Sequence, residues 1–169
     1  MVKMVSKSDI FTVLKTIPDP EMPISITDLG LIEDVEIQHS IAHISLLPTF
    51  IGCFALPAIA EEIKQKVGDL QGIDSVEVIF IHDPAWSVDR ITAEGRASLA
   101  EHGISVPNGS SPCCSDGTTE TVALTTSAIS CPWCNSSDTK LTSPFGPTRC
   151  KSIHFCNHCR HPFERMKKL

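Results

Sequence analysis

Residues 46–63 read LLPTFIGCFALPAIAEEI, and this stretch predicts a strand, a short turn and a helix in immediate succession. The apolar strand ends near Pro48, and the turn contains Gly52 and Cys53. Beyond the turn, apolar residues recur at the spacing of one buried helical face. These residues are Leu56, Ile59, Ala60, Ile63 and Val67. Pro57 falls in the first helical turn, where its missing N–H has no cost.

Cys53 is the first candidate for a functional residue, because this pattern places it at or just before a helix N-terminus. Free backbone N–H groups and the positive end of the helix dipole favour a thiolate, which is the form that attacks or binds metal. A buried cysteine can instead act as a small hydrophobic residue. The position alone leaves both interpretations open.

The chain of 169 residues is long enough for one domain and a small additional module. Its hydrophobic content of 41% is that of a globular protein, and no apolar run approaches the ~20 residues that span a bilayer. Residues 1–7 lack the apolar core of a secretory signal. The eight cysteines therefore indicate metal or redox chemistry instead of a disulfide scaffold. We expect a cytoplasmic protein with no membrane partner.

Charge is distributed unevenly along the chain. Residues 1–130 contain 7 Lys and Arg against 18 Asp and Glu, whereas residues 131–169 contain 7 against 2. This asymmetry indicates two modules with different partners. The acidic part is a poor candidate for nucleic-acid binding, and the basic tail suits either nucleic acid or an acidic protein surface.

The first module is predicted to be an α+β domain over residues 1–104, with the order α-β-β-α-β-α and helices on one sheet. Ser6 and Asp9 resemble a capping box, His39 and Ser40 suit a hairpin turn, and Thr92 suits a helix N-cap. The expected elements are helices at 6–17, from the Cys53 turn to about 68, and at 92–102, and strands at 33–38, 41–47 and 75–81.

Three polar side chains of this domain are further candidates for a site. Asp19 and Glu21 lie in a proline-rich segment that presents them in a defined way, so they could serve as oxygen ligands beside the thiol. Solvated carboxylates at a helix exit are the simpler interpretation. His82 follows a predicted strand, where a structural role is the commoner one.

Residues 105–130 are rich in Ser, Thr, Gly and Pro and are predicted to be a linker. Cys113 and Cys114 lie within it, and adjacent cysteines in such a segment suit redox chemistry or weak metal binding. We favour incidental thiols that are prone to oxidation.

Residues 131–169 contain two CxxC pairs with 21 residues between them. Each pair forms a tight turn, and two such turns complete a tetrahedral site of four thiolates, the usual structural zinc geometry. A module of this size cannot bury enough core to fold alone, so metal binding would supply its folding energy. Short strands are expected at 139–145 and 151–155, joined by a Gly/Pro turn. We therefore predict a zinc ribbon, although iron suits the same thiolates, and assign no role to Cys150. The ligands are Cys131, Cys134, Cys156 and Cys159.

Several segments resemble known signatures. Residues 19–30 (DPEMPISITDLG) and 48–53 (PTFIGC) are similar to the two signature segments of the metal–sulfur cluster assembly family, which includes the SufT-type factors. Residues 85–96 (AWSVDRITAEGR) and 145–151 (FGPTRCK), together with the ribbon, are similar to the PaaD family of phenylacetate degradation. The resemblance covers nearly the whole chain except the linker.

The resemblance implies an accessory protein that helps to assemble iron–sulfur or iron centres in client enzymes. Cys53 matches the invariant thiol of the family, and Thr49 lies in the same signature segment. The implied clients are the di-iron subunit or the iron–sulfur reductase of a phenylacetyl-CoA oxygenase (epoxidase) that acts in aromatic catabolism. Phe54 and Arg90 depart from the family pattern, which often has Pro and Trp there.

One thiolate cannot hold an iron–sulfur cluster, which usually takes four cysteine ligands. Cys53 therefore needs further ligands from a second subunit of a homodimer, from the client, or from Asp19, Glu21 or His82, or else it acts only as a transient donor. Two other functions remain open. The chain could be a zinc-ribbon adaptor that docks on protein or nucleic acid, or a thiol enzyme with His82 as the base. A subunit integral to the oxygenase complex is a further alternative.

Overall fold

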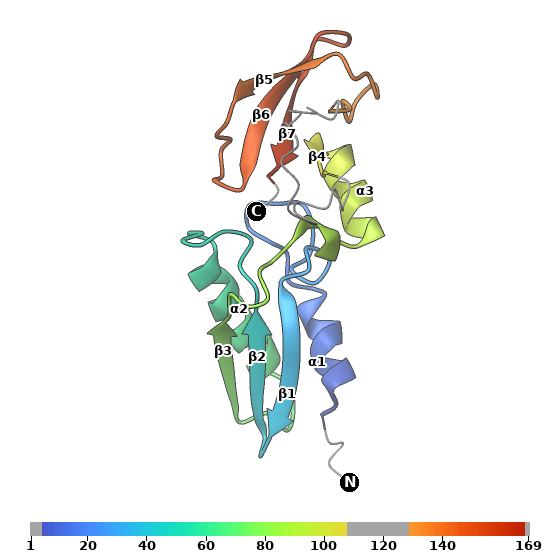
Figure 1. Cartoon of the computed structure of the whole chain (residues 1–169). Coiled ribbons are helices and arrows are strands. Elements are labelled where there is room, and N and C mark those ends of the chain that lie inside the picture. The colour runs from blue at the N-terminus through green and yellow to red at the C-terminus, as the bar shows by residue number, and fades with distance from the viewer. Residues whose placement is uncertain (1–4, 108–128, 168–169) are drawn as a thin grey trace, which may run out of the picture.

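The computed structural model describes residues 5–107 and 129–167, which fold around two sheets (Figure 1). The first sheet and its helices correspond to the predicted α+β domain. Its elements are α1 (Lys7–Leu14), β1 (Ile32–Gln38), β2 (Ile41–Leu46), α2 (Leu56–Gly68) and β3 (Ser75–Phe80). They follow the predicted order, and the helix α3 (Ala93–Glu101) comes after them.

The first sheet has the strand order β1-β2-β3. β1 and β2 form an antiparallel hairpin, and His39 and Ser40 adopt positive φ angles of 48° and 65° at its turn, which confirms the predicted turn. β3 pairs parallel to β2. A parallel neighbour needs a crossover connection, and α2 supplies it.

The core lies between this sheet and the two helices. Alternate residues of β2 are buried, so one face of the sheet is covered. α1 packs against β1, α2 packs against β3, and the helices also contact each other. The residues that α1 and α2 bury are Ile10, Leu14, Ile59, Ile63 and Val67. The helical face that the sequence predicted after the Cys53 turn is therefore confirmed.

Local signals set the helix ends. Ser6 and Asp9 form the predicted capping box at α1. Thr92 caps α3, where its Oγ1 accepts a hydrogen bond of 3.0 Å from the backbone of Gly95. Gly103 ends this helix with a φ of +74°, in the left-handed region that suits glycine. A single 3-10 turn, η1 (Val88–Arg90), precedes α3.

The second sheet contains the ribbon strands β5 (Thr139–Ser143), β6 (Lys151–Cys156) and β7 (Pro162–Met166). Its strand order is β4-β7-β6-β5, and β4 (Ile104–Ser105) comes from the end of the first part of the chain. β5 and β6 confirm two predicted strands. β7 was not predicted, and neither was its parallel pairing with β4, which ties the ribbon to the segment after α3.

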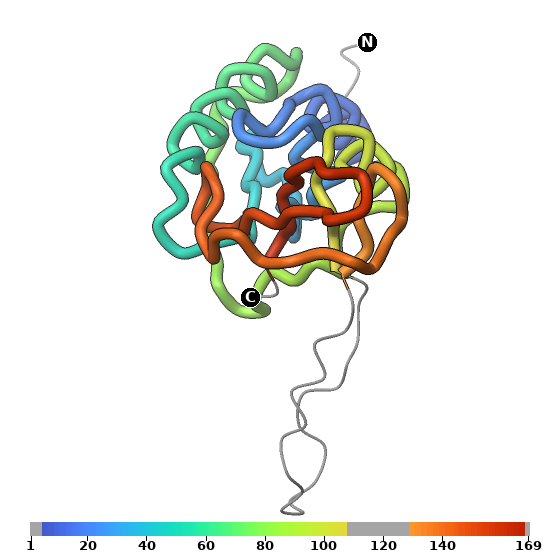
Figure 2. The backbone as a smooth tube through the Cα atoms, turned by 90° about the horizontal axis from the view of Figure 1, so that it is seen from above, coloured from blue at the N-terminus to red at the C-terminus, as the bar shows by residue number. Residues whose placement is uncertain are grey.

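The ribbon packs directly on the α+β domain. It lies above the domain in Figure 1 and in front of it in the view from above (Figure 2). Two of its residues, Cys150 and Met166, are buried in the same hydrophobic core as α1 and α2. Trp133 packs against Gly103. The chain is thus an α+β fold with a zinc-ribbon-like module attached at its upper end. Among the described residues, no helix combines the length and the apolar character needed to cross a membrane.

Candidate functional site

Cys53 lies in the turn between β2 and α2. Its backbone N–H donates to the carbonyl of Phe50 over 3.2 Å, and Gly52 has a φ of +83°. α2 begins at Leu56 with Ala55 as its N-cap, so Cys53 comes three residues before the helix. This position agrees with the expectation from sequence.

The protonation of Cys53 differs from that expectation. Burial of the thiol raises the pKa of Cys53; the N–H of Ala55 lowers this pKa, and Glu21 and Asp19 raise it. Burial and the two carboxylates together outweigh the amide, so the net shift of the pKa is upward. The backbone N–H groups before α2 therefore do not bring the pKa of Cys53 below its ordinary value.

The segment with Asp19 and Glu21 forms a tight turn that points toward Cys53. Asp19 donates its backbone N–H to the carbonyl of Ile24 over 2.9 Å, and its Oδ1 accepts from the backbone of Glu21 over 2.8 Å. Burial raises the pKa of Asp19. Glu21 stays exposed, and its Oε2 lies 4.0 Å from Sγ of Cys53. The structure thus brings the Glu21 carboxylate beside the thiol, and Asp19 lies near enough to raise the pKa of Cys53.

Cys53 and Glu21 line a cavity of about 160 Å³ that sequence analysis did not anticipate. Part of its wall comes from the turn before β6 in the ribbon, including Arg149 and Cys150. The full lining consists of Glu21, Phe50, Gly52, Cys53, Phe54, Pro147, Thr148, Arg149 and Cys150. In the sequence, residues 145–151 (FGPTRCK) were the only signal of this part of the wall. The spacing of residues along the chain could not show which part of the α+β domain this segment would contact.

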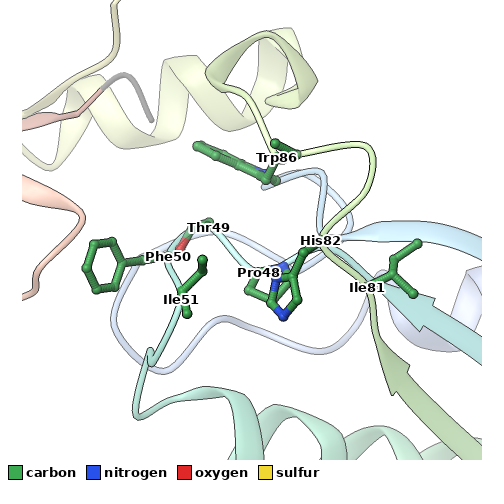
Figure 3. Close-up of a pocket in the computed structure, with 8 residues that line it drawn as sticks. Pro48, Thr49, Phe50, Ile51, Ile81, His82 and Trp86 are labelled. Atoms are coloured by element: carbon green, nitrogen blue, oxygen red, sulfur yellow. The ribbon is translucent and has the colours of Figure 1, made fainter.

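His82 and Thr49 lie in a second, larger cavity of about 380 Å³ (Figure 3). Its lining is mostly apolar and includes Trp86, whose Nε1 donates to the carbonyl of Leu29 over 3.0 Å. Phe50 lines both cavities, and Figure 3 shows it pointing away from His82. His82 is not among the residues that line the Cys53 cavity.

Two large apolar side chains flank Cys53 on the surface. Ile51 is 76% exposed and Phe54 is 83% exposed. The guanidinium of Arg149 lies over the Phe54 ring, 5.9 Å from its centroid. These two side chains expose apolar surface on both sides of the thiol in sequence.

The four cysteines of the CxxC pairs converge as predicted. Their Sγ atoms all lie within 4.8 Å of one another, with 3.7 Å between Cys131 and Cys159 and 3.6 Å between Cys134 and Cys156. Tetrahedral thiolates at Zn–S distances of about 2.3 Å would be separated by about 3.8 Å. The group therefore fits a tetrahedral metal ion. No other group of three or more potential ligands converges in this way within residues 5–107 and 129–167.

The two CxxC turns have the same local design. The backbone of Asn135 donates to the carbonyl of Cys131, and that of Arg160 donates to Cys156, both over 2.9 Å. Asn135 and Arg160 have positive φ angles of 58° and 62°. The N–H of Cys159 lowers the pKa of the Cys156 thiol, whereas burial raises the pKa values of Cys131 and Cys159. A metal ion would therefore have to displace protons from these thiols when it binds. Cys113 and Cys114 lie outside the described residues.

Both parts of the chain match known families. Residues 7–80 match the family described as iron–sulfur cluster assembly protein, and residues 115–167 match the PaaD zinc beta ribbon domain. The first part is also similar to a solved domain of unknown function, DUF59, from Bacillus anthracis, with 26% identity, a TM-score of 0.53, and coverage of 55% of this chain and 90% of that one.

Relatives extend the match to the whole chain. An iron–sulfur protein maturation auxiliary factor of Bacillus subtilis, YitW, is 31% identical over 94 residues, covering 55% of this chain and 92% of its own. An Escherichia coli protein assigned to 1,2-phenylacetyl-CoA epoxidase as one of its subunits is 37% identical over 160 residues, covering 94% of this chain and 91% of its own. This chain belongs to the PaaD family, which joins an iron–sulfur cluster assembly domain to a zinc ribbon.

Proposed function

We propose that this protein is an accessory factor that assists the assembly of iron–sulfur or iron centres in a phenylacetyl-CoA oxygenase (epoxidase) of aromatic catabolism. The observation that carries the proposal is the Cys53 thiol, held half-buried beside Glu21 at a cavity whose rim exposes Ile51 and Phe54. The relatives named as maturation factors match the domain that contains this thiol.

Each residue of the site has a proposed part in holding iron as cargo. Cys53 would bind iron as a thiolate after losing its proton, since a thiolate is the form that binds metal. Glu21 would supply an oxygen ligand or accept that proton. Asp19 would position Glu21, because its Oδ1 accepts the Glu21 backbone N–H. Ile51 and Phe54 would contact the client, whose own ligands would then receive the iron.

The ribbon is proposed to hold zinc in a structural role. Four thiolates leave no open coordination position for chemistry, which is the pattern of structural zinc sites. Of the described residues, only Cys131, Cys134, Cys156 and Cys159 form such a group. We propose the division expected from sequence, in which residues 1–104 carry the reactive thiol, residues 105–130 are a linker and residues 131–169 bind the metal.

The other functions receive less support from the geometry. A thiol enzyme would need His82 within reach of Cys53, but the two residues line different cavities. An adaptor for nucleic acid would use the cations of the ribbon, two of which are engaged within the protein: Lys151 pairs with Glu164, and Lys167 donates to the carbonyl of Arg149. We therefore propose a binding and transfer protein of the cytoplasm, acting on oxygenase or reductase subunits and not as a catalyst.

The test is maturation of the client in cells. The oxygenase and reductase subunits are co-expressed with the wild-type chain, with Cys53→Ser, or with Cys114→Ser as the control thiol. We expect Cys53→Ser to lower the iron content and activity of one client to the level found without the chain, and Cys114→Ser to leave both unchanged. Full client maturation with Cys53→Ser would contradict the proposal.

A further inference from the structure

The larger of the two cavities lies where two parallel strands end. β2 and β3 pair in parallel, and their last residues, Leu46 and Phe80, are partners in the register. The segments 48–51 and 81–86 therefore leave the sheet at the same edge, and together they supply the whole lining of the cavity (Figure 3). In open α/β sheets, ligands bind in the crevice outside the carboxyl ends of the parallel strands. The β2–α2–β3 unit places this cavity in the equivalent position.

The size and the walls of this cavity suit a small molecule. Its volume of about 380 Å³ falls within the range of ligand pockets, roughly 300–1,000 Å³, which are lined mainly by apolar and aromatic side chains. Pro48 and Trp86 are buried, whereas Ile51 and Ala85 are exposed, so the cavity runs from the interior to the surface. The indole N–H of Trp86 is already bonded to the carbonyl of Leu29. The Trp86 ring therefore offers the cavity an apolar surface.

Thr49 adds an unpaired hydroxyl to this apolar lining. The residue is only 7% exposed, and its side chain makes no hydrogen bond within residues 5–107 and 129–167. In the same ranges, Nδ1 of His154 is the only fully enclosed polar side-chain atom without a partner, so Oγ1 of Thr49 is not sealed off. Buried polar groups are nearly always hydrogen-bonded. Solvent satisfies this hydroxyl while the cavity is empty, and the polar group of a ligand would take the place of that water.

His82 is the only ionisable residue in the lining. Its side chain is exposed, and it has no hydrogen-bond or ion-pair partner in the described part of the chain. The other seven lining residues contain no Asp, Glu, Lys or Arg. A charged group that enters an apolar site without a partner loses its hydration at a high cost in free energy. The cavity therefore favours an uncharged ligand.

We propose that this cavity binds an uncharged aromatic compound of one or two rings that carries one hydrogen-bonding group. The inference goes beyond the proposed function, because neither Cys53 nor Glu21 lines this cavity. Trp86 packs against the ring, since aromatic pairs gain stability beyond the burial of their area. Oγ1 of Thr49 can donate or accept, so it bonds the polar group of the ligand. An apolar cavity of about 150 Å³ holds benzene, and the larger volume here leaves room for one or two rings.

The test titrates the full-length, zinc-loaded chain with p-cresol and, separately, with toluene, which is the same ring without the hydroxyl. The chain has two tryptophans, whose indole N–H signals are followed in proton–nitrogen correlation spectra. Trp86 lines the cavity and Trp133 does not. We expect the Trp86 signal to shift saturably with both compounds and the Trp133 signal to stay in place. The absence of a saturable shift of Trp86 in the wild type would overturn the proposal.

Two variants test the walls of the site. Thr49→Val keeps the shape of the side chain and removes its hydroxyl. It should weaken p-cresol binding about 2- to 10-fold, the effect of one hydrogen bond, and leave toluene binding unchanged. Ala85→Leu fills the cavity from an exposed position and should weaken both compounds, whereas Ala58→Leu, at an exposed position of α2 outside the cavity, should weaken neither. Undiminished binding by Ala85→Leu would overturn the assignment of the cavity.

The class of ligand is tested with p-toluate, which carries a carboxylate on the same ring. We expect p-toluate to bind more weakly than p-cresol, and tighter binding would overturn the preference for an uncharged compound. An equal effect of Thr49→Val on p-cresol and toluene would overturn the role of the hydroxyl. Cys53→Ser should bind p-cresol as the wild type does. Ligand binding and client maturation are therefore separate outcomes, and the failure of one leaves the other standing.

Discussion

The Sγ atom of Cys53 lies 4.0 Å from Oε2 of Glu21, although 32 residues separate the two in sequence. The proline-bounded turn that holds Glu21 and the turn before α2 therefore meet at one point. Both groups become anions when they ionise, so each disfavours ionisation of the other. Together with burial, the Glu21 carboxylate therefore favours the protonated form of the Cys53 thiol.

Glu21→Gln should make Cys53 more reactive at a given pH. Removing the carboxylate removes one of the contributions that raise the pKa of Cys53. A larger fraction of the residue is then thiolate, which is the nucleophile. The measurement is the rate of iodoacetamide alkylation of Cys53 against pH, whose midpoint should move to lower pH.

The control for this experiment is Glu61→Gln, which removes an exposed carboxylate from α2 outside the Cys53 cavity. It should leave the alkylation midpoint where it is in the wild type. If Glu21→Gln also left the midpoint unchanged, the carboxylate would not act on the thiol in solution.

Asp19→Asn should stabilise the fold more as the pH rises. Burial raises the pKa of Asp19 above that of the unfolded chain, so the folded state binds more protons between the two values. The stabilising contribution of Asp19 is therefore present at low pH, and it is lost as the pH rises through the pKa that Asp19 has in the folded protein. Asn stays neutral, and its oxygen can still accept from the Glu21 backbone.

Urea unfolding from about pH 4 to about pH 7 measures this effect, a range that lies above the ordinary Asp pKa of about 3.9. The difference in free energy of unfolding between Asp19→Asn and the wild type should grow in favour of the variant along this range. Asp74→Asn, at an exposed position, should show no such trend. A difference independent of pH would contradict a raised pKa for Asp19.

The sequence predicted the elements of the α+β domain because they depend on local patterns. The helical stripe after Cys53 and the capping residues Ser6 and Thr92 act over a few residues, and all appear as expected. β7 escaped prediction because its five residues begin with a proline and alternate weakly. Its pairing with β4 is a contact between distant segments that no local pattern encodes.

The candidate site was only partly predictable for the same reason. Motifs drew attention to Cys53, Asp19 and Glu21, which the fold brings together. The position of His82 after a predicted strand made it a candidate ligand or base beside the thiol. In the structure, His82 lines the neighbouring cavity instead. Cys150 reaches the site only because the ribbon docks on the domain, and this packing arises from tertiary contacts.

Cys134→Ser should remove the ribbon metal and unfold the ribbon. A module of this size depends on its metal for folding energy. A single four-thiolate site holds about one zinc per chain. We expect the zinc content of Cys134→Ser to fall to a small fraction of that. The double variant Cys113→Ser/Cys114→Ser should keep its zinc. In Cys134→Ser, the backbone amides of β5, β6 and β7 should lose their protection from hydrogen exchange. If Cys134→Ser retained its zinc, the four-cysteine site would be contradicted.

Gly103→Ala should loosen the ribbon from the domain. A Cβ at Gly103 would lie 2.3 Å from Cζ2 of Trp133, and the φ of +74° is strained for any other residue. We expect the free energy of unfolding to fall by about 1–2 kcal/mol from the backbone strain and by about 1–3 kcal/mol from overpacking.

Gly52→Ala is the control, because its φ of +83° brings the backbone cost while its Cβ meets nothing within 4 Å. Thermal unfolding should show the larger loss for Gly103→Ala, and adding Trp133→Ala should recover the excess. Equal losses for the two glycine variants would show that Trp133 does not pack there in solution.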